Sequence, residues 1–328
     1  MRRITLPANW GFAVLGLSLF SALVFSAPAQ ATPGSGAWPK EMIQASQNRI
    51  VLPVVMLSAN MEPWLTRVNT YRSMAALGPV MNNPEWSLGA AAHARYIVAT
   101  GTLLPYEDTL SPHYSPEGNL AAGFSLQLGQ TSVNFTDNDT IDYWIRSPFQ
   151  ALALLDPQWT ETGFGSHRAT GGLYQTGAVL DVVRGFEETP QVTYPVFWPG
   201  NGSTTTLKTY SGYDDPNPLA HSNCANAQGL PIILQVGKGT STVSLTTSTP
   251  TIIRLNGSPI FHCAFSEYEF TVPNDTDATE DGRLLLNQRD AIVMIPTNPL
   301  SAGAYSVTVT VLVDNVQRQY TWSFTVAN

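Results

Sequence analysis

The feature that most restricts the fold of this chain is a regular alternation of apolar and polar residues close to its C-terminus. Every second residue of 305–313 is apolar, and the alternation continues through residues 316–326. The two residues between these runs, Asp314 and Asn315, tolerate the positive φ of a tight hairpin turn. A hairpin with one apolar face must bury that face against another layer. This end of the chain is therefore predicted to belong to a β-sandwich.

A helical period replaces the alternation in the first half of the chain. Apolar residues recur at three- and four-residue spacing on one face of a predicted first helix: Met61, Trp64, Leu65, Val68, Tyr71 and Ala75. Gly78 and Pro79 stop this helix, and a second is predicted over residues 85–99, with Gly101 after its end. His93 lies in the second helix, where we expect a partly exposed side chain and not a metal ligand.

Two shorter helices and a small sheet are predicted next. Thr136 opens a segment rich in N-cap residues, and Ser147-Pro148 has the residue types that begin a helix. Strand-like runs follow at residues 162–164, 173–176 and 178–183. Helices followed by a small sheet predict an α+β domain for this half of the chain.

The first 31 residues have the pattern of a secretory signal peptide. Arg2 and Arg3 precede an apolar run at residues 11–25, and Ala29-Gln30-Ala31 is a small-x-small cleavage site. A retained membrane anchor is the alternative, although the run is short for a spanning helix. No second apolar stretch is long enough to cross a bilayer. We therefore expect no membrane span in the mature chain and a secreted or periplasmic location.

The charge balance argues against one class of partner. The chain contains 16 Lys and Arg residues against 24 Asp and Glu residues. Cleavage after Ala31 removes two arginines and no acid, which leaves a net charge of 14 − 24 = −10. Nucleic-acid binding requires clustered basic residues that replace counterions, and no basic stripe is present. We expect no nucleic-acid partner.

Two cysteines are present, Cys224 and Cys263. In an oxidising compartment we expect them to form a disulfide. It would close a loop of about 40 residues and stabilise the fold by roughly 4 kcal/mol in the chain-entropy model. Two buried free thiols are the alternative, whereas a metal site lacks a nearby ligand partner for each cysteine.

Proline and changing composition divide the chain into segments. We assign residues 1–31 to the signal peptide, 32–56 to a leader, 57–185 to the α+β domain, 186–203 to a linker and 204–328 to the β-sandwich.

Four short blocks, in this order, carry a resemblance to a known family. They are His-Tyr-Ser-Pro-Glu-Gly-Asn at 113–119, Trp-Ile-Arg-Ser-Pro-Phe-Gln at 144–150, Leu-Leu-Asp-Pro at 154–157 and Gly-Phe-Gly at 163–165. Together with Asn69-x-x-Arg72 on the first helix, they resemble the bacterial members of the CAP superfamily (cysteine-rich secretory, antigen 5 and pathogenesis-related 1 proteins), also called the SCP domain. The resemblance implies an α-β-α sandwich for residues 57–185.

The C-terminal segment carries a second resemblance. Pro-Leu-Ser-Ala-Gly-Ala-Tyr at 299–305 is similar to the start of a hairpin in bacterial immunoglobulin-like (Ig-like) domains. This resemblance implies an all-β, Ig-like sandwich after the α+β domain.

CAP domains place two histidines and two acidic residues around a central cleft, and some members bind Zn²⁺ or another divalent ion there. The resemblance places His113, Glu117, Asp142 and Gln150 at the cleft of this chain. Gln150 stands where the family has its second histidine, and glutamine is a poor zinc ligand. The family block also reads Gly-Glu-Asn without interruption, whereas here Gly118 separates Glu117 from asparagine.

His113 and Glu117 are thus, at best, the two residues of this cleft that could bind a metal ion. Each candidate cleft residue also has an alternative role. His113 is otherwise a loop residue, Glu117 a solvated carboxylate, and Asp142 an exposed charge favoured by a helix dipole. We expect no resident cofactor. Adding Asp142 to the pair would make an oxygen-rich site suited to a weakly held divalent cation such as Ca²⁺ or Mg²⁺.

These residues indicate a secreted binding module that has no catalytic residues. Its cleft would hold a small ligand, lipid, peptide or cell-wall component, and the β-sandwich would be an accessory. Two alternatives remain open, a metal-dependent extracellular hydrolase or protease and a structural envelope protein, because fold resemblance does not choose among them.

Overall fold

The computed structural model describes residues 62–187, 193–246 and 251–328. By its contacts the chain divides into residues 1–58 and 59–328, and all described residues belong to the second unit. The predicted signal peptide (1–31) and leader (32–56) lie outside the described residues. In the described ranges, no helix is both long enough and apolar enough to span a membrane.

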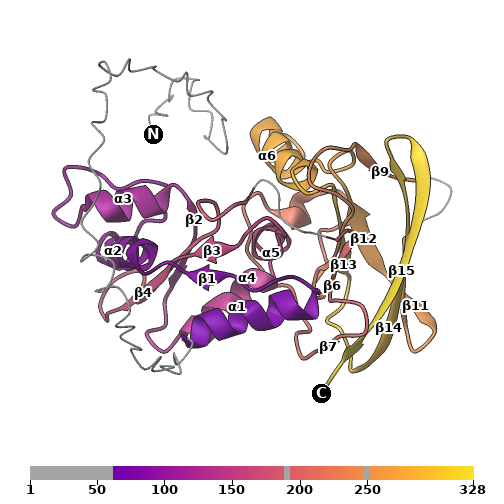
Figure 1. The fold of residues 1–328 in the computed structure, drawn as a ribbon, viewed down its shortest axis with the longest axis horizontal. Helices are drawn as coiled ribbons and strands as arrows, with labels where there is room; N and C mark the ends of the chain where they lie inside the picture. Colours follow the sequence, from indigo (N-terminus) through magenta and orange to yellow (C-terminus); the bar gives the residue numbers. More distant parts are fainter. Residues whose placement is uncertain (1–61, 188–192, 247–250) are drawn as a thin grey trace, which may run out of the picture. The chain divides into compact units, whose positions relative to one another are not determined.

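The first part of the described chain combines helices with short strands (Figure 1). They are α1 (Pro63–Met74), β1 (Met81–Asn82), α2 (Pro84–Thr100), α3 (Pro116–Ala122), β2 (Ser125–Gln130), α4 (Asp137–Ile145), α5 (Pro148–Leu154), β3 (Glu161–Thr162), β4 (Phe164–Arg168) and β5 (Thr176–Asp181). Helices α1 and α2 are the two predicted helices. The side chain of Asn83 accepts from the amides of Glu85 and Trp86 at the start of α2, and Gly101 ends α2 with a φ of 70°.

Strands β2, β5 and β4 form an antiparallel sheet with a buried cluster on each face. On the central strand β5, Ala178 and Leu180 belong to the core that includes residues of α1, α4 and α5. Val179 instead packs with Ala90 and Ile97 of α2. Because successive strand residues point to opposite faces, helices cover both sides of the sheet. This is the predicted α-β-α sandwich.

Helix α2 lies against the backbone of β4 because glycines leave room for it. A Cβ at Gly165 would lie 2.0 Å from the main-chain nitrogen of Ala91, and one at Gly163 would lie 2.5 Å from Cβ of Trp86. Both distances are far inside van der Waals contact, so any larger residue would push the helix off the sheet. The Gly-Phe-Gly block is therefore a packing requirement.

The Asn-x-x-Arg block of α1 holds neighbouring turns in place. Asn69 donates from Nδ2 to the carbonyl of Val80 at 3.1 Å and accepts from the Val80 amide at 2.8 Å. Arg72 is 2% exposed, and its guanidinium donates to four carbonyl oxygens at 2.8–2.9 Å: those of Gly78, Leu154, Asp156 and Trp159. These bonds tie α1 to the Leu-Leu-Asp-Pro block, so both blocks serve the fold.

The second part of the described chain is β-rich. Its elements are β6 (Val196–Trp198), β7 (Thr204–Thr205), a short 3₁₀ helix (Pro218–Ala220), β8 (Ile232–Gln235), β9 (Val243–Leu245), β10 (Ile252–Leu255), β11 (Ser258–Ile260), β12 (His262–Phe265), α6 (Thr276–Asn287), β13 (Ala291–Pro296), β14 (Gly303–Val313) and β15 (Val316–Val326). One sheet has the order β11-β10-β14-β15-β7, with β9 also on β14, and another has the order β12-β13-β8-β6. The predicted hairpin is β14–β15, closed by the pair Val313↔Val316. Helix α6 is an element that the sequence analysis does not predict.

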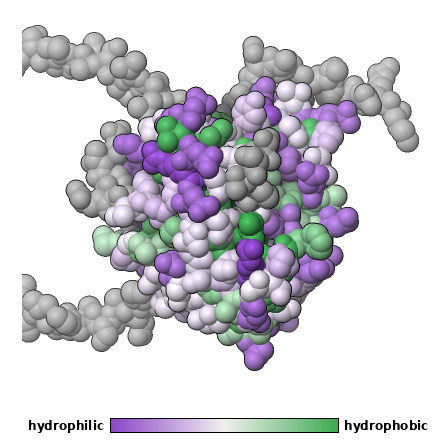
Figure 2. Space-filling model, turned by 90° about the vertical axis from the view of Figure 1, so that its right-hand side faces the viewer, coloured by the Kyte–Doolittle hydropathy of each residue, from purple (hydrophilic) through white to green (hydrophobic). Residues whose placement is uncertain are grey.

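The two sheets bury a common core, as the apolar face of the hairpin requires. Val307 and Trp322 of the hairpin share this core with Ile232, Leu234 and Met294 of the facing sheet. The other face of the hairpin carries serine, threonine and glutamine. Figure 2 views the molecule from the side of β14 and β15, where the surface is largely polar or neutral with scattered apolar residues.

The sheet that contains β8 and β13 is buried on both faces. Its residues Ile233, Val293 and Ile295 point away from the hairpin, into the core that also contains α5. There Phe149 of α5 packs with its ring centroid 5.4 Å from that of Phe270. All four residues of β8 are buried, which is typical of a strand covered on both sides. The β-rich part therefore packs directly on the helical part.

Strand β6 lies within the segment assigned to the linker. Val196–Trp198 pairs with β8 and closes one edge of the second sheet. The domain boundaries at residues 185 and 203 remain a prediction.

Cys224 and Cys263 form the predicted disulfide. Their Cα atoms are 5.3 Å apart, and the bridge spans 39 residues of sequence. Both residues are buried.

Candidate functional site

An open pocket lies beside the C-terminal half of α2, where the loop of residues 101–115 passes over the helix. The pocket measures about 610 Å³, within the usual range of small-molecule sites. Its lining combines aromatic, aliphatic, hydroxyl and carboxylate groups: Tyr96, Thr100, Thr102, Leu104, Tyr106, Asp108 and Ser111. This composition allows both apolar contact and directed hydrogen bonds.

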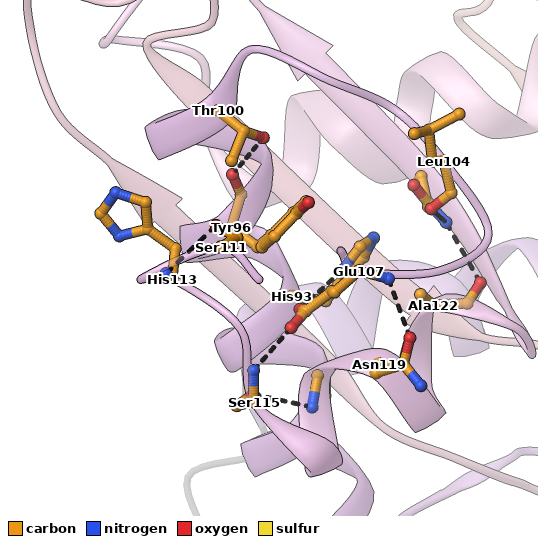
Figure 3. A network of polar contacts seen from close by, with 12 residues as sticks. His93, Tyr96, Thr100, Leu104, Glu107, Ser111, His113, Ser115, Asn119 and Ala122 are labelled. Atoms are coloured by element: carbon orange, nitrogen blue, oxygen red, sulfur yellow. Dashed lines mark hydrogen bonds and ion pairs between the residues drawn. The ribbon is translucent and has the colours of Figure 1, made fainter. Parts of the chain in front are cut away.

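The loop is fixed to α2 by a buried pair of side chains (Figure 3). Nδ1 of His93 on α2 lies 2.9 Å from Oε1 of Glu107 in the loop, and neither side chain has any exposed surface. If Glu107 is a carboxylate, the proton of this bond belongs to Nδ1 of His93. Removing one partner would leave a buried polar group unpaired, which is strongly destabilising. The pair therefore holds the wall of the pocket in one position.

Glu107 also holds the beginning of α3. Its Oε2 accepts from the amide of Ser115 at 2.7 Å, and its own amide donates to Oδ1 of Asn119 at 2.8 Å. Ser115 is the N-cap of α3, and its Oγ accepts from the amide of Gly118. A Cβ at Gly118 would lie 2.3 Å from Oε1 of Glu107. Glycine at this position is what allows the carboxylate to reach α3.

Tyr96 links the buried pair to the pocket. Its ring stacks on that of His93, with centroids 5.8 Å apart, and its hydroxyl accepts from the amide of Asp108 at 3.0 Å. Nε2 of His93 is buried and has no hydrogen-bond partner within the described residues. With the proton on Nδ1, Nε2 is an acceptor.

The predicted cleft residues do not converge on this pair. His113 is exposed, and its ring is directed away from His93 and Glu107 (Figure 3). Glu117 is exposed in the first turn of α3. Gln150 is half-buried on α5, which belongs to the other helical layer. Their role in binding remains a prediction.

Asp142 takes part in a contact between helices. Its carboxylate accepts from Nε of Arg67 at 2.5 Å, from Nη2 of Arg67 at 2.7 Å and from the Tyr71 hydroxyl at 2.5 Å. Burial, with Asp142 as the next cause, raises the pKa of Tyr71. These bonds join α4 to α1, and a cation at Asp142 would have to displace Arg67.

A second polar cluster surrounds the beginning of α5. Ser147 occupies the N-cap position, but its Oγ contacts Oγ of Ser211 and donates to the carbonyl of Tyr213 at 2.8 Å. Asp214 from the β-rich part supplies the cap instead, because its Oδ2 accepts from the amide of Phe149 at 2.9 Å. Burial raises the pKa of Asp214, and its Oδ1 has no partner among the described residues.

The donor groups do not fit a zinc site. Within the ranges that the structure describes, no three His, Cys, Asp or Glu side chains lie close enough to share a metal ion. His93 and Glu107 provide two donors, whereas catalytic zinc uses three protein ligands. The residues present thus differ from the metal-binding set that the resemblance implies for some members of the family.

Comparison with known proteins settles the family of the helical part. Residues 65–182 match the model of CAP, the cysteine-rich secretory protein family. This segment is a CAP domain. No curated protein matches the chain. Among solved structures, selenomethionine PcoC, a copper resistance protein from Escherichia coli, is similar at 15% identity and a TM-score of 0.23, covering 40% of this chain and 95% of that chain. A likeness this weak carries no argument about the CAP domain or the β-rich part.

The CAP block around Asn119 explains why sequence reasoning missed the buried pair. The expectation of a partly exposed His93 is wrong, because Glu107, 14 residues further on, gives the imidazole a buried partner. In the family the glutamate directly precedes asparagine, and here Gly118 stands at that position. The space beside Gly118 holds the carboxylate of Glu107. When a block that otherwise matches the family lacks its acidic residue, the preceding loop is thus the place to search for a carboxylate that replaces it.

Proposed function

We propose that this CAP-domain protein is a non-enzymatic binding module that holds an extracellular ligand in the pocket beside α2. The observation that carries the proposal is a preformed pocket whose wall is anchored by a fully buried His93–Glu107 pair. Long ordered loops in compact domains commonly carry function, and buried polar anchoring supplies the preorganisation that binding needs. The β-rich part is an accessory to this module.

The lining favours a ligand with an apolar face and several hydrogen-bond donors. Tyr96, Leu104 and Tyr106 offer rings and aliphatic surface on which sugar or side-chain faces pack. Asp108 adds a negative charge that favours amines and hydroxyls over acids. A peptide or a cell-wall glycopeptide has this combination of groups, whereas a bare acyl chain lacks the donors. We therefore place peptide and cell-wall ligands ahead of lipid.

An extracellular location agrees with the chemistry of the chain. The matching family is described as secretory, and the disulfide between Cys224 and Cys263 is of a kind that persists in oxidising compartments. The hydrolase alternative needs a metal cluster or another catalytic set. The buried pair does not provide such a set, because neither His93 nor Glu107 reaches solvent.

Binding can be measured by calorimetry with three probes: a muropeptide, its isolated stem peptide and a fatty acid. Tyr106 is 54% exposed at the pocket, and Tyr106→Ala should weaken binding of the muropeptide or the peptide by about tenfold or more, as expected for loss of about 1.4 kcal/mol of ring contact. Tyr268→Ala is the matched control, since Tyr268 is 74% exposed in the β-rich part and should leave affinity unchanged.

The other outcomes reject the proposal in different ways. Equal affinity in wild type and Tyr106→Ala would place the binding site elsewhere. Cleavage of the muropeptide or the peptide would favour the hydrolase. Failure of all three probes to bind would favour the structural envelope protein.

A further inference from the structure

Strand β15 has an edge that is only partly covered. Its neighbour β7 pairs with it only at Thr325 and Val326. Next to these, the amide of Ser323 donates to Oδ1 of Asn201, and its carbonyl accepts from the amide of Gly202. Main-chain groups alternate in direction along a strand, so those of Gln317, Gln319 and Thr321 point to the same outer edge. In the described part of the chain, none of these three residues has a main-chain partner on that side.

The other exposed edges of this sheet are protected. On β9 the outward amides of Val243 and Leu245 donate to the carboxylates of Glu267 and Glu269 at 3.0 and 2.9 Å. Strand β11 is only three residues long. Short edge strands and charged side chains are the usual devices against unwanted strand pairing. Residues 316–321 have no proline or carboxylate, and Arg318 is their one charge.

We propose that this edge pairs with the same edge of a second copy of the chain, in antiparallel register about Gln319. Gln319 then lies opposite Gln319 of the other copy, and Gln317 lies opposite Thr321. Each of the three outward residues contributes an amide and a carbonyl, so each strand offers 3 × 2 = 6 free groups, all of which find partners. The two hairpins join in one continuous sheet related by a two-fold axis, as expected for an isologous dimer.

The side chains select this register. With Gln319 on the axis, Arg318 of one copy lies opposite Tyr320 of the other, where a guanidinium and an aromatic ring attract. Moving the two-fold axis by one residue, from Gln319 to Arg318, would place Arg318 opposite Arg318, and like charges directly opposite destabilise a sheet. A shift in the other direction would require Ser323, which is already paired with Asn201 and Gly202. The register also sets Val316, 57% exposed in the single chain, opposite Trp322.

Sedimentation equilibrium of the mature protein tests the pairing over a wide range of concentration. We expect a monomer–dimer equilibrium for the wild type. Gln319→Pro should weaken it by about tenfold or more, because proline removes an outward amide and leaves the main-chain bonds to β14 intact. Tyr320→Lys should also weaken it, because lysine would face Arg318 of the other copy. Adding Arg318→Glu to Tyr320→Lys should restore the dimer through opposite charges.

Tyr268→Lys is the control, since it adds the same charge at an exposed tyrosine away from the edge and should leave the equilibrium unchanged. Near-ultraviolet circular dichroism of each variant checks that the sandwich is still folded. A wild type that is monomeric throughout would overturn the proposal. So would a dimer that is indifferent to Gln319→Pro and Tyr320→Lys, or a double variant that is no better than Tyr320→Lys.

Discussion

Replacing Glu107 by glutamine isolates the buried pair that holds the pocket loop. The carboxylate has two acceptor oxygens, and each has one donor: Nδ1 of His93 at 2.9 Å and the amide of Ser115 at 2.7 Å. An amide has one oxygen and one NH₂ group in almost the same volume. One of the two donors must then face another donor.

A change of tautomer at His93 does not remove this mismatch. If the proton moves to Nε2, Nδ1 can accept from the new amide, but Nε2 is buried without a partner among the described residues. In either arrangement one buried N–H is unpaired, which costs about 1–3 kcal/mol. We therefore expect Glu107→Gln to lower the free energy of unfolding by about 2 kcal/mol. Glu107→Ala leaves both donors unpaired beside a cavity and should cost about 3–5 kcal/mol.

Urea denaturation followed by tryptophan fluorescence gives these free energies. Hydrogen exchange adds a local measurement, in which the amides of Glu107 and Ser115 should exchange faster in Glu107→Gln. Glu117→Gln is the control, because Glu117 is exposed in α3 and its substitution should change stability by less than about 0.5 kcal/mol. If the two glutamine variants have the same stability and the same exchange rates, the buried pair does not hold the loop.

Three further predictions concern the core, the α5 cap and the disulfide. Gly165→Ala should cost about 2 kcal/mol or more, because its Cβ would meet Ala91 of α2, whereas Gly78→Ala, with open space around it, should be near neutral by the same urea titration. Burial raises the pKa of Asp214 in the folded state, so the folded protein holds this proton more tightly than the unfolded chain does. The stability that protonated Asp214 provides is complete below its pKa in the unfolded chain, about 4, and is lost as the pH rises through the folded pKa. Asp214→Asn should therefore gain stability relative to wild type as the pH rises through this window. The exposed Asp215→Asn should not. Replacing Cys224 and Cys263 together by alanine should cost about 4 kcal/mol in the chain-entropy model, and reductant should bring the wild type close to the variant; a midpoint of unfolding that reductant leaves unchanged would contradict a stabilising bridge.

The main elements of the fold are readable from sequence because their signals are periodic and local. A three- and four-residue spacing fixes α1 and α2, a two-residue spacing fixes β14 and β15, and Gly101 and Asp314-Asn315 mark ends that need a positive φ. Strand β8 gives a weaker signal, since a strand buried on both faces has no alternation to detect. Helix α6 is not predicted from the sequence, because the segment that contains it is expected to form an all-β sandwich.

What the sequence alone determined about this protein is therefore its order of layers, its CAP blocks and its one pair of cysteines. The tertiary structure decided which polar side chains meet. His93 finds Glu107 at 14 residues' distance, and Asp214 caps α5 at a distance of 65 residues from Phe149. Such pairs depend on the path of loops and on the packing of one part against another, and neither leaves a period in the sequence. Burial then makes each pair energetically important, because a polar group removed from water must find its partner inside the fold.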